Sequence, residues 1–397
     1  MKRILFGVST VCALSFSLFA HPHSGMDDQS QSNTPARMTT PNKWQQCMLD
    51  KEGWIEGGAE WLFLSSNLTP LFTQEQFLIA DNNVPLRNVD TFVNDRKYVN
   101  PSYNSGFSLF FRYRASTDND LTVNYSYLRN NGAGSYKVST PDNTVGNQTF
   151  STAITNDDRA NLHSHMHVFD VMAGRQLPIN YQMFARLSGG FSVSDFHMFF
   201  QFSDYDITDF TSLPNPSILN SINTHYKEHH RFWGIGPKGQ FDFEFMMLPS
   251  NWNHSLNFSF WTQFALLFGR DWSNGKNVRT TDTNITAPTR NINTEVDPWR
   301  SNPKFLLIPN FNLDIGLKYR WESSFQDMIF NLAVGYRVYT YWNMDMLFTG
   351  RYLTPGGTRI ETNNDEFVID LRPTRQNIDN VDHLIYAGPY IRASLAY

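Results

Sequence analysis

From Trp54 onward the chain is dominated by strict alternation of apolar and polar positions. In the segment 311–319 the odd positions are Phe, Leu, Ile, Leu and Tyr, whereas the even positions are Asn, Asp, Gly and Lys. Segments 107–113 and 121–127 follow the same rule. Period two predicts β-strands, because successive side chains of a strand point to opposite faces. Ten segments carry the pattern: 54–65, 104–115, 120–129, 163–176, 181–194, 231–247, 254–270, 305–320, 328–342 and 384–397.

The connections between these segments alternate in length. Residues 116–119, 177–180, 248–253 and 321–327 form short turns, whereas 66–103, 130–162, 195–230, 271–304 and 343–383 are long and polar. A tilted strand of about 9–11 residues crosses a bilayer, and barrels of the outer membrane have short periplasmic turns and longer extracellular loops. The pattern predicts an all-β fold, a transmembrane antiparallel β-barrel of about ten strands. If the long connections contain further strands, the number is twelve or more.

The N-terminus predicts the compartment. Lys2 and Arg3 precede an apolar run over 4–19, and Leu18-Phe19-Ala20 forms a cleavage site, which is typical of a secretory signal peptide. The expected organisation is a signal peptide at 1–20, a polar leader at 21–53 and a barrel at 54–397, placed in the bacterial outer membrane. Only Cys47 survives processing, so no disulfide forms within the mature chain, and pairing with another chain stays open.

Composition narrows the class of protein. The chain is 41% hydrophobic, 15% aromatic and 17% charged, and its mean hydropathy is −0.42. This profile argues against disorder and against a bundle of membrane helices. The net charge of −5 becomes more acidic when Lys2 and Arg3 are removed, which gives no reason to expect a nucleic-acid partner.

Aromatic residues gather at both ends of the predicted strands. They predict two girdles at the membrane interfaces, made at the short-turn ends by Tyr113, Tyr181, Trp252, Tyr319 and Trp321 and at the long-loop ends by Trp233, Tyr341 and Trp342. The chain closes on an alternating strand with Ile391, Ala393, Leu395 and Tyr397. A last strand that pairs with the first removes the edges of the sheet, and we expect this strand to engage the barrel-assembly machinery.

Three stretches carry a family resemblance. Gly234-Ile-Gly-Pro-Lys-Gly239, Phe311-Asn-Leu-Asp-Ile-Gly-Leu-Lys-Tyr319 and Gly388-Pro-Tyr-Ile-Arg-Ala-Ser-Leu-Ala-Tyr397 resemble the Legionella-type major outer membrane protein family, with related MOMP-like porins in chlamydia-like bacteria. Trp54–Leu64 is similar to the first strand of that family. The resemblance implies an outer-membrane barrel with porin-like behaviour and surface exposure. That family is often cross-linked through cysteines, whereas this chain keeps only Cys47.

Two strings match motifs of enzymes but stand in the wrong context. Gly234-x-Gly236-x-x-Gly239 fits a dinucleotide fingerprint, yet a strand rather than a helix follows it. His225-Tyr-Lys-Glu-His229 fits a zinc-peptidase string, which requires a helix and a further ligand. We read residues 195–230 as a loop, and His163, His165 and His167 as interface histidines rather than metal ligands. We therefore expect no enzyme, no cofactor and no metal site.

The preferred function is a porin-like channel for the passive passage of small solutes or ions. The alternative is a non-conducting structural or adhesion protein that displays long extracellular loops. Ten strands leave a narrow lumen, which weakens the first reading, and the long loops strengthen the second. The expected partners are outer-membrane lipid and small solutes, and a homo-oligomer is compatible with the sequence.

Carrying the alternation through the barrel predicts a lumen wall with eight bases and six acids. They are Arg112, Arg114, Arg186, Lys238, Lys318, Arg320, Arg337 and Arg392, with Glu56, Glu60, Asp170, Asp242, Glu244 and Asp314. In one reading these charges pair and brace the wall. In the other, the surplus of bases near the periplasmic end constricts the pore and favours anions weakly.

Overall fold

The computed structural model describes the barrel and much of its connections. The described residues are 53–68, 71–75, 95–116, 118–139, 143–145, 148–179, 182–211, 218–248, 254–283, 290–323, 328–346, 360–362, 365–367 and 381–397. The predicted signal peptide, Cys47 and all of the predicted leader except Gly53 lie outside them. Among these residues, no helix is long and apolar enough to cross a membrane.

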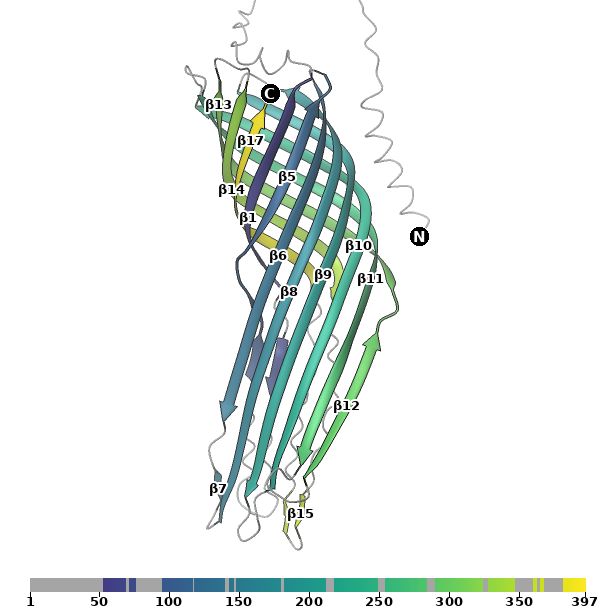
Figure 1. Ribbon diagram of the computed structural model, residues 1–397. Helices are drawn as coiled ribbons and strands as arrows, with labels where there is room; N and C mark the ends of the chain where they lie inside the picture. The colour runs from purple at the N-terminus through teal and green to yellow at the C-terminus, as the bar shows by residue number, and fades with distance from the viewer. Residues whose placement is uncertain are drawn as a thin grey trace, which may run out of the picture.

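Ten long strands form one closed sheet, tilted around a common axis (Figure 1). They are β1 (Ile55–Ser66), β5 (Asn104–Arg114), β6 (Asn119–Ser139), β8 (Gln148–Pro178), β9 (Met183–Thr211), β10 (Ile218–Leu248), β11 (His254–Thr283), β13 (Lys304–Glu322), β14 (Ile329–Met346) and β17 (Val381–Ala396). Shorter strands lie in the connections: β2 (Leu71–Glu75), β3 (Asp95–Tyr98), β4 (Asn100–Pro101), β7 (Asn143–Val145), β12 (Asn291–Arg300), β15 (Ile360–Thr362) and β16 (Asp365–Phe367).

The ring closes because the first long strand pairs with the last. β1 lies antiparallel to β17, with Ala59 opposite Ala393, and it pairs with β5 on its other edge. β6 pairs with β8, so neighbouring strands continue around the ring until β14 meets β17. Within a bilayer no water pairs with free backbone groups, so a spanning sheet has to close in this way. The prediction of an antiparallel barrel of about ten strands is confirmed.

Alternating exposure follows the alternation in the sequence. Along β1, Trp61 is 58% exposed on the outside, whereas its neighbour Leu62 is fully buried inside. On the same strand Glu60 also points inward and is buried. An outward apolar band around a barrel faces lipid hydrocarbon, so the inside of the barrel is where polar chemistry is available.

Three of the predicted long loops are in large part strands, which corrects the sequence interpretation. β8 and β9 remain paired from Pro178 opposite Phe184 out to Ser151 opposite Thr211, and β9, β10 and β11 continue in the same way. These strands run far beyond the closed part of the barrel, together with β12 (Figure 1). The prediction of 130–162, 195–230 and 271–304 as loops was wrong. Outside the membrane the outer face of a strand needs no apolar residues, so the alternation weakens there although inward residues such as Phe200 and Phe202 remain buried.

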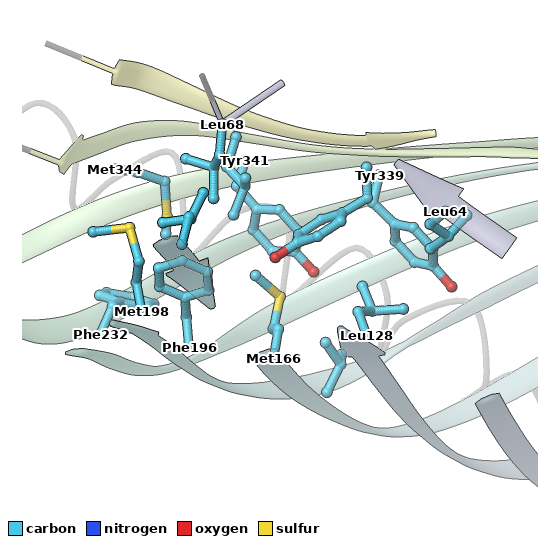
Figure 2. Packing of buried hydrophobic residues seen from close by; sticks show 14 of the residues in the cluster. Leu64, Leu68, Leu128, Met166, Phe196, Met198, Phe232, Tyr339, Tyr341 and Met344 are labelled. Atoms are coloured by element: carbon cyan, nitrogen blue, oxygen red, sulfur yellow. The ribbon is translucent and has the colours of Figure 1, made fainter. Parts of the chain in front are cut away.

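The interior has two layers. Toward the short turns it is lined by charged and polar side chains around a cavity. Toward the long hairpins it is filled by an apolar cluster, in which side chains from opposite walls point toward one another (Figure 2). We call these the charged chamber and the apolar cluster. Members of the cluster labelled in Figure 2 are Leu64, Leu68, Leu128, Met166, Phe196, Met198, Phe232, Tyr339, Tyr341 and Met344.

Candidate functional site

The charged chamber is a cavity of about 190 Å³ near the short-turn end of the barrel. Inward positions of most barrel strands contribute to its wall, because period two turns every second residue toward the axis. Of the charged residues predicted for the lumen, all except Arg114 and Asp314 line it. Arg114 and Asp314 are buried in the wall instead.

Arg337 on β14 organises the most buried part of the wall. Its Nη1 donates to Glu60 Oε2 at 2.8 Å, and its Nε and Nη2 donate to Asp314 Oδ2 at 2.9 and 2.7 Å. The guanidinium also lies 4.6 Å from the ring centre of Trp261 and 4.7 Å from that of Tyr390. A buried cation is costly unless it is paired and hydrogen-bonded, and here both acids and both rings compensate it.

Arg186 on β9 forms a second cluster. It donates to both oxygens of Asp120, at 2.8 and 2.5 Å, to Asp242 at 2.8 Å and to the Thr122 hydroxyl at 2.9 Å. Asp120 was missed by the sequence interpretation, although Asp120 and Thr122 continue the inward series of β6. An additional buried acid reduces the surplus of bases that the sequence indicates.

Other bases of the wall also have acidic or polar partners. Lys238 Nζ lies 2.8 Å from Asp170, and Lys318 Nζ lies 2.7 Å from Glu244. Arg112 is held more loosely, 3.4 Å from Glu56, and it is 23% exposed to the cavity. Further contacts join Arg392 to Glu60 and Arg114 to Gln176, and Arg320 is buried in the wall. The chamber is therefore lined by matched charges rather than by a field of one sign.

The aromatic residues predicted for the interfaces fall into three groups. Tyr113, Tyr319 and Trp321 are exposed on the outside at the short-turn end, and Trp233 and Trp342 are exposed at the other end. Tyr341 is buried in the apolar cluster, so its assignment to the girdle was wrong. It precedes Trp342 on one strand, and adjacent residues of a strand face opposite sides. Tyr181 and Trp252 lie outside the described residues.

The predicted closing strand forms the seam of the barrel. Ile391, Leu395 and Tyr397 are exposed on the outer surface, and Ala393 lies on the same face. β1 pairs with one edge of β17, and β14 pairs with the other edge.

Both enzyme-like strings lie within β10. His225 to His229 form a strand segment paired with β9 and β11, so neither the predicted loop nor the helix of a zinc peptidase is present there. His225 Nδ1 is 2.9 Å from the Ser203 hydroxyl. No group of three or more metal-ligating side chains occurs among the described residues.

In the glycine string Gly234-x-Gly236-x-x-Gly239, one glycine permits close packing of two strands. A Cβ at Gly236 would lie 1.6 Å from the carbonyl oxygen of Leu266, whereas one at Gly239 would meet no heavy atom within 4 Å. Glycine inside a strand marks such a close approach.

Comparisons with known proteins point to one family. A family model described as the Legionella pneumophila major outer membrane protein precursor matches residues 51–396. Among solved structures, the crystal structure of a Pseudomonas aeruginosa FadL homologue aligns with 88% of this chain and 91% of that chain, at 8% identity and a TM-score of 0.21. No curated protein matches the sequence.

Proposed function

Since the chain belongs to the Legionella major outer membrane protein family, we propose that this outer-membrane barrel is a channel for small polar solutes or ions. Solutes occupy the charged chamber, and the apolar cluster closes the path between the chamber and the extracellular hairpins. Passage requires displacement of side chains in this cluster, so the openings of the channel are brief or their conductance is small.

The observation that carries the proposal is the chamber itself. A barrel of this size that serves only as an anchor can fill its interior with side chains. Here a cavity of about 190 Å³ is kept open and lined by paired ions, which is large and polar enough for several waters. Paired charges of both signs hydrate a small solute without binding one ion strongly, and weak binding favours passage.

The apolar cluster is suited to act as a gate. Phe196, Met166 and Phe232 project inward from β9, β8 and β10, and each is at most 2% exposed. Hydrophobic constrictions gate channels by excluding water. Because these three side chains carry no charge, truncating one of them widens the constriction and leaves the ion pairs in the wall of the charged chamber in place.

A second candidate, display of surface structures by an anchored barrel, is favoured by one observation. β8, β9, β10 and β11 have 29 to 31 residues, about three times the length that a bilayer requires. Paired hairpins of this length present a stiff surface to the exterior. The two functions differ in whether ions cross the barrel.

Planar-bilayer conductance separates the candidates when the wild-type chain is compared with Phe196→Ala and Phe191→Ala. Phe191 lies on the same strand as Phe196 but is 57% exposed on the outside, so it controls for loss of an aromatic ring. We expect small conductance steps for the wild type, larger or more frequent steps for Phe196→Ala, and wild-type behaviour for Phe191→Ala. Silence of all three proteins across voltages and salts would support the anchor instead.

A further inference from the structure

Just beyond the apolar band, the outer surface of five neighbouring strands is rich in basic and imidazole groups. The band on these strands ends at Phe169, Val193, Trp233 and Phe268, all of which point outward. The next outward positions form a patch, here termed the cationic belt. Its members are Arg129 of β6, His163, His165 and His167 of β8, His197 of β9, Lys227, His229 and Arg231 of β10, and Arg270 and Lys276 of β11.

One row of direct cross-strand neighbours forms the centre of the belt. Arg129 is opposite His165, His165 opposite His197, His197 opposite Arg231, and Arg231 opposite Trp272. The rings of His165 and His197 are stacked with centres 4.9 Å apart, and the Arg231 guanidinium lies 5.3 Å from the centre of the Trp272 ring. The barrel register thus places one arginine on each side of a stacked pair of imidazole rings.

The sign of the belt is unusual for this chain. The belt covers the outward positions of five segments, one on each strand, and these positions hold five Lys or Arg and five His. The segments are 127–131 of β6, 163–167 of β8, 195–201 of β9, 227–231 of β10 and 270–276 of β11. Asp195 is the one acid at these positions. It accepts two hydrogen bonds from Arg231 at 3.0 and 2.9 Å and lies 3.2 Å from Nε2 of His197. The belt is therefore positively charged, although the whole chain carries a net charge of −5.

We propose that the cationic belt binds the phosphate groups of an outer-leaflet lipid headgroup. The belt begins where the apolar band ends on the long-hairpin side, which is the depth of the headgroups in the outer leaflet. Basic clusters at this depth recognise phosphorylated headgroups. The guanidinium forks of Arg129 and Arg270 are exposed, and such a fork matches phosphate oxygens in two hydrogen bonds. Acyl chains of the same lipid then lie along the apolar band below.

Packing among aromatic rings alone does not account for the belt. His163 stacks on Phe199 with ring centres 6.4 Å apart, and His229 packs against the same ring in a tilted arrangement at 4.7 Å, which anchors those rings without an anion. In contrast, Arg129 at the end of the central row and Arg270 on β11 are exposed and place positive charge at headgroup depth. Charges on a lipid-facing surface are costly in hydrocarbon, so their concentration at one depth points to an anionic headgroup as occupant.

The test uses the delipidated full chain in detergent and two probes, bis-phosphorylated lipid A and the same lipid after removal of both phosphates. Binding is counted by native mass spectrometry for the wild type and for Arg129→Gln/Arg270→Gln, which removes two exposed guanidinium groups and leaves the pair of Arg231 with Asp195 intact. Arg175→Gln is the matched control, because Arg175 lies on β8 at the opposite, short-turn end and its side chain is 46% exposed. Heat-modifiable gel mobility verifies folding, and Arg129→Gln/Lys276→Gln replaces the first variant if that one does not fold.

We expect the wild type to prefer the phosphorylated lipid at least tenfold. At about a factor of five per basic residue near a charged surface, the double variant should lose roughly 25-fold in affinity, and Arg175→Gln should keep the wild-type affinity. Equal binding of both lipids, or an equal loss in Arg175→Gln, would overturn the proposal. Complete displacement by an equimolar amount of inorganic phosphate would overturn it too, because the belt would then take free phosphate rather than a lipid.

Discussion

Arg337 and Glu60 form an ion pair, with Nη2 2.7 Å from Oε1, although 277 residues separate them in the chain. Arg337 lies on β14 and Glu60 on β1, and β17 runs between these two strands. The pair therefore crosses the strand that closes the barrel. Both side chains are at most 3% exposed, so the attraction between them acts with little screening by water.

Arg337→Met should destabilise the barrel strongly, because it leaves Glu60 and Asp314 buried without their common cation. Removal of one partner from a buried ion pair costs about 3–5 kcal/mol, and a fall of this size is expected in the free energy of unfolding measured in urea with lipid-reconstituted protein. Arg175→Met serves as the control, since Arg175 and Asp118 form an exposed pair at 3.9 Å that is worth less than about 1 kcal/mol. Equal losses in both variants would contradict the role of Arg337 at the seam.

Arg112→Ser should shift the reversal potential of the channel toward cations and raise its conductance. Arg112 lies 3.4 Å from Glu56, the same separation as between Arg392 and Glu60. Removal of Arg112 leaves Glu56 with hydrogen bonds from two neutral donors, Ser394 and Asn331. Lys137→Ser, on the exposed hairpin of β6, should leave both quantities unchanged. Reversal potentials under a salt gradient measure the effect. An unshifted potential together with a lower melting temperature would mean that Arg112 braces the wall without contributing to ion preference.

Gly236→Ala should prevent barrel assembly, whereas Gly239→Ala should be tolerated. The first Cβ would lie 1.6 Å from the Leu266 carbonyl oxygen, so β10 and β11 would have to move apart, and the second would meet open space. Because both variants add the same methyl group to the same strand, their comparison isolates the close approach. Heat-modifiable gel mobility of outer-membrane fractions reports the folded amount. Normal folding of Gly236→Ala would show that the two strands separate at little cost.

Glu228 should make stability depend on pH in the extracellular part of β10. It lies beyond Trp233, is fully buried opposite Phe200, and accepts a hydrogen bond from the Tyr226 hydroxyl at 2.7 Å. Burial raises the pKa of Glu228 to about 8 from its usual 4.5. The folded state thus binds this proton more tightly than the unfolded state, and the free energy of unfolding falls as pH rises from about 4.5 to 8.

Melting temperatures between pH 4.5 and 9 test this expectation. Glu228→Gln should remove most of the decline and be more stable than the wild type above pH 8, because no charge is then buried. Glu295→Gln, at an exposed site on β12, should follow the wild-type curve. Parallel curves for the wild type and Glu228→Gln would show that the carboxyl titrates normally.

Ten strands, their ends at the short turns and the closure of the last strand on the first could be predicted from the sequence, whereas the outer ends of β8, β9, β10 and β11 could not. Along β13 and β5 one face meets hydrocarbon and the other meets the interior, so residues such as Ile315 and Asp314 must alternate wherever the strand is in the membrane. This constraint is local, and it can be read one strand at a time. Beyond the membrane the outer face no longer has to be apolar. Inward residues such as Phe202 and Glu228 are still buried there, but without a lipid-facing series the outer halves of β9 and β10 resembled loops.

Tertiary structure alone decided what the inward residues do. Phe196, Tyr341 and Leu64 come from distant parts of the chain, and only the closure of the ring brings them into one apolar cluster. Similarly, the partners of Arg337 and Arg186 depend on the register and on the curvature of the wall, which place Glu60 across β17 and Asp120 across β8. Alternation specifies the face of each side chain, but a contact requires two faces at a fixed distance, and that distance is a property of the closed barrel.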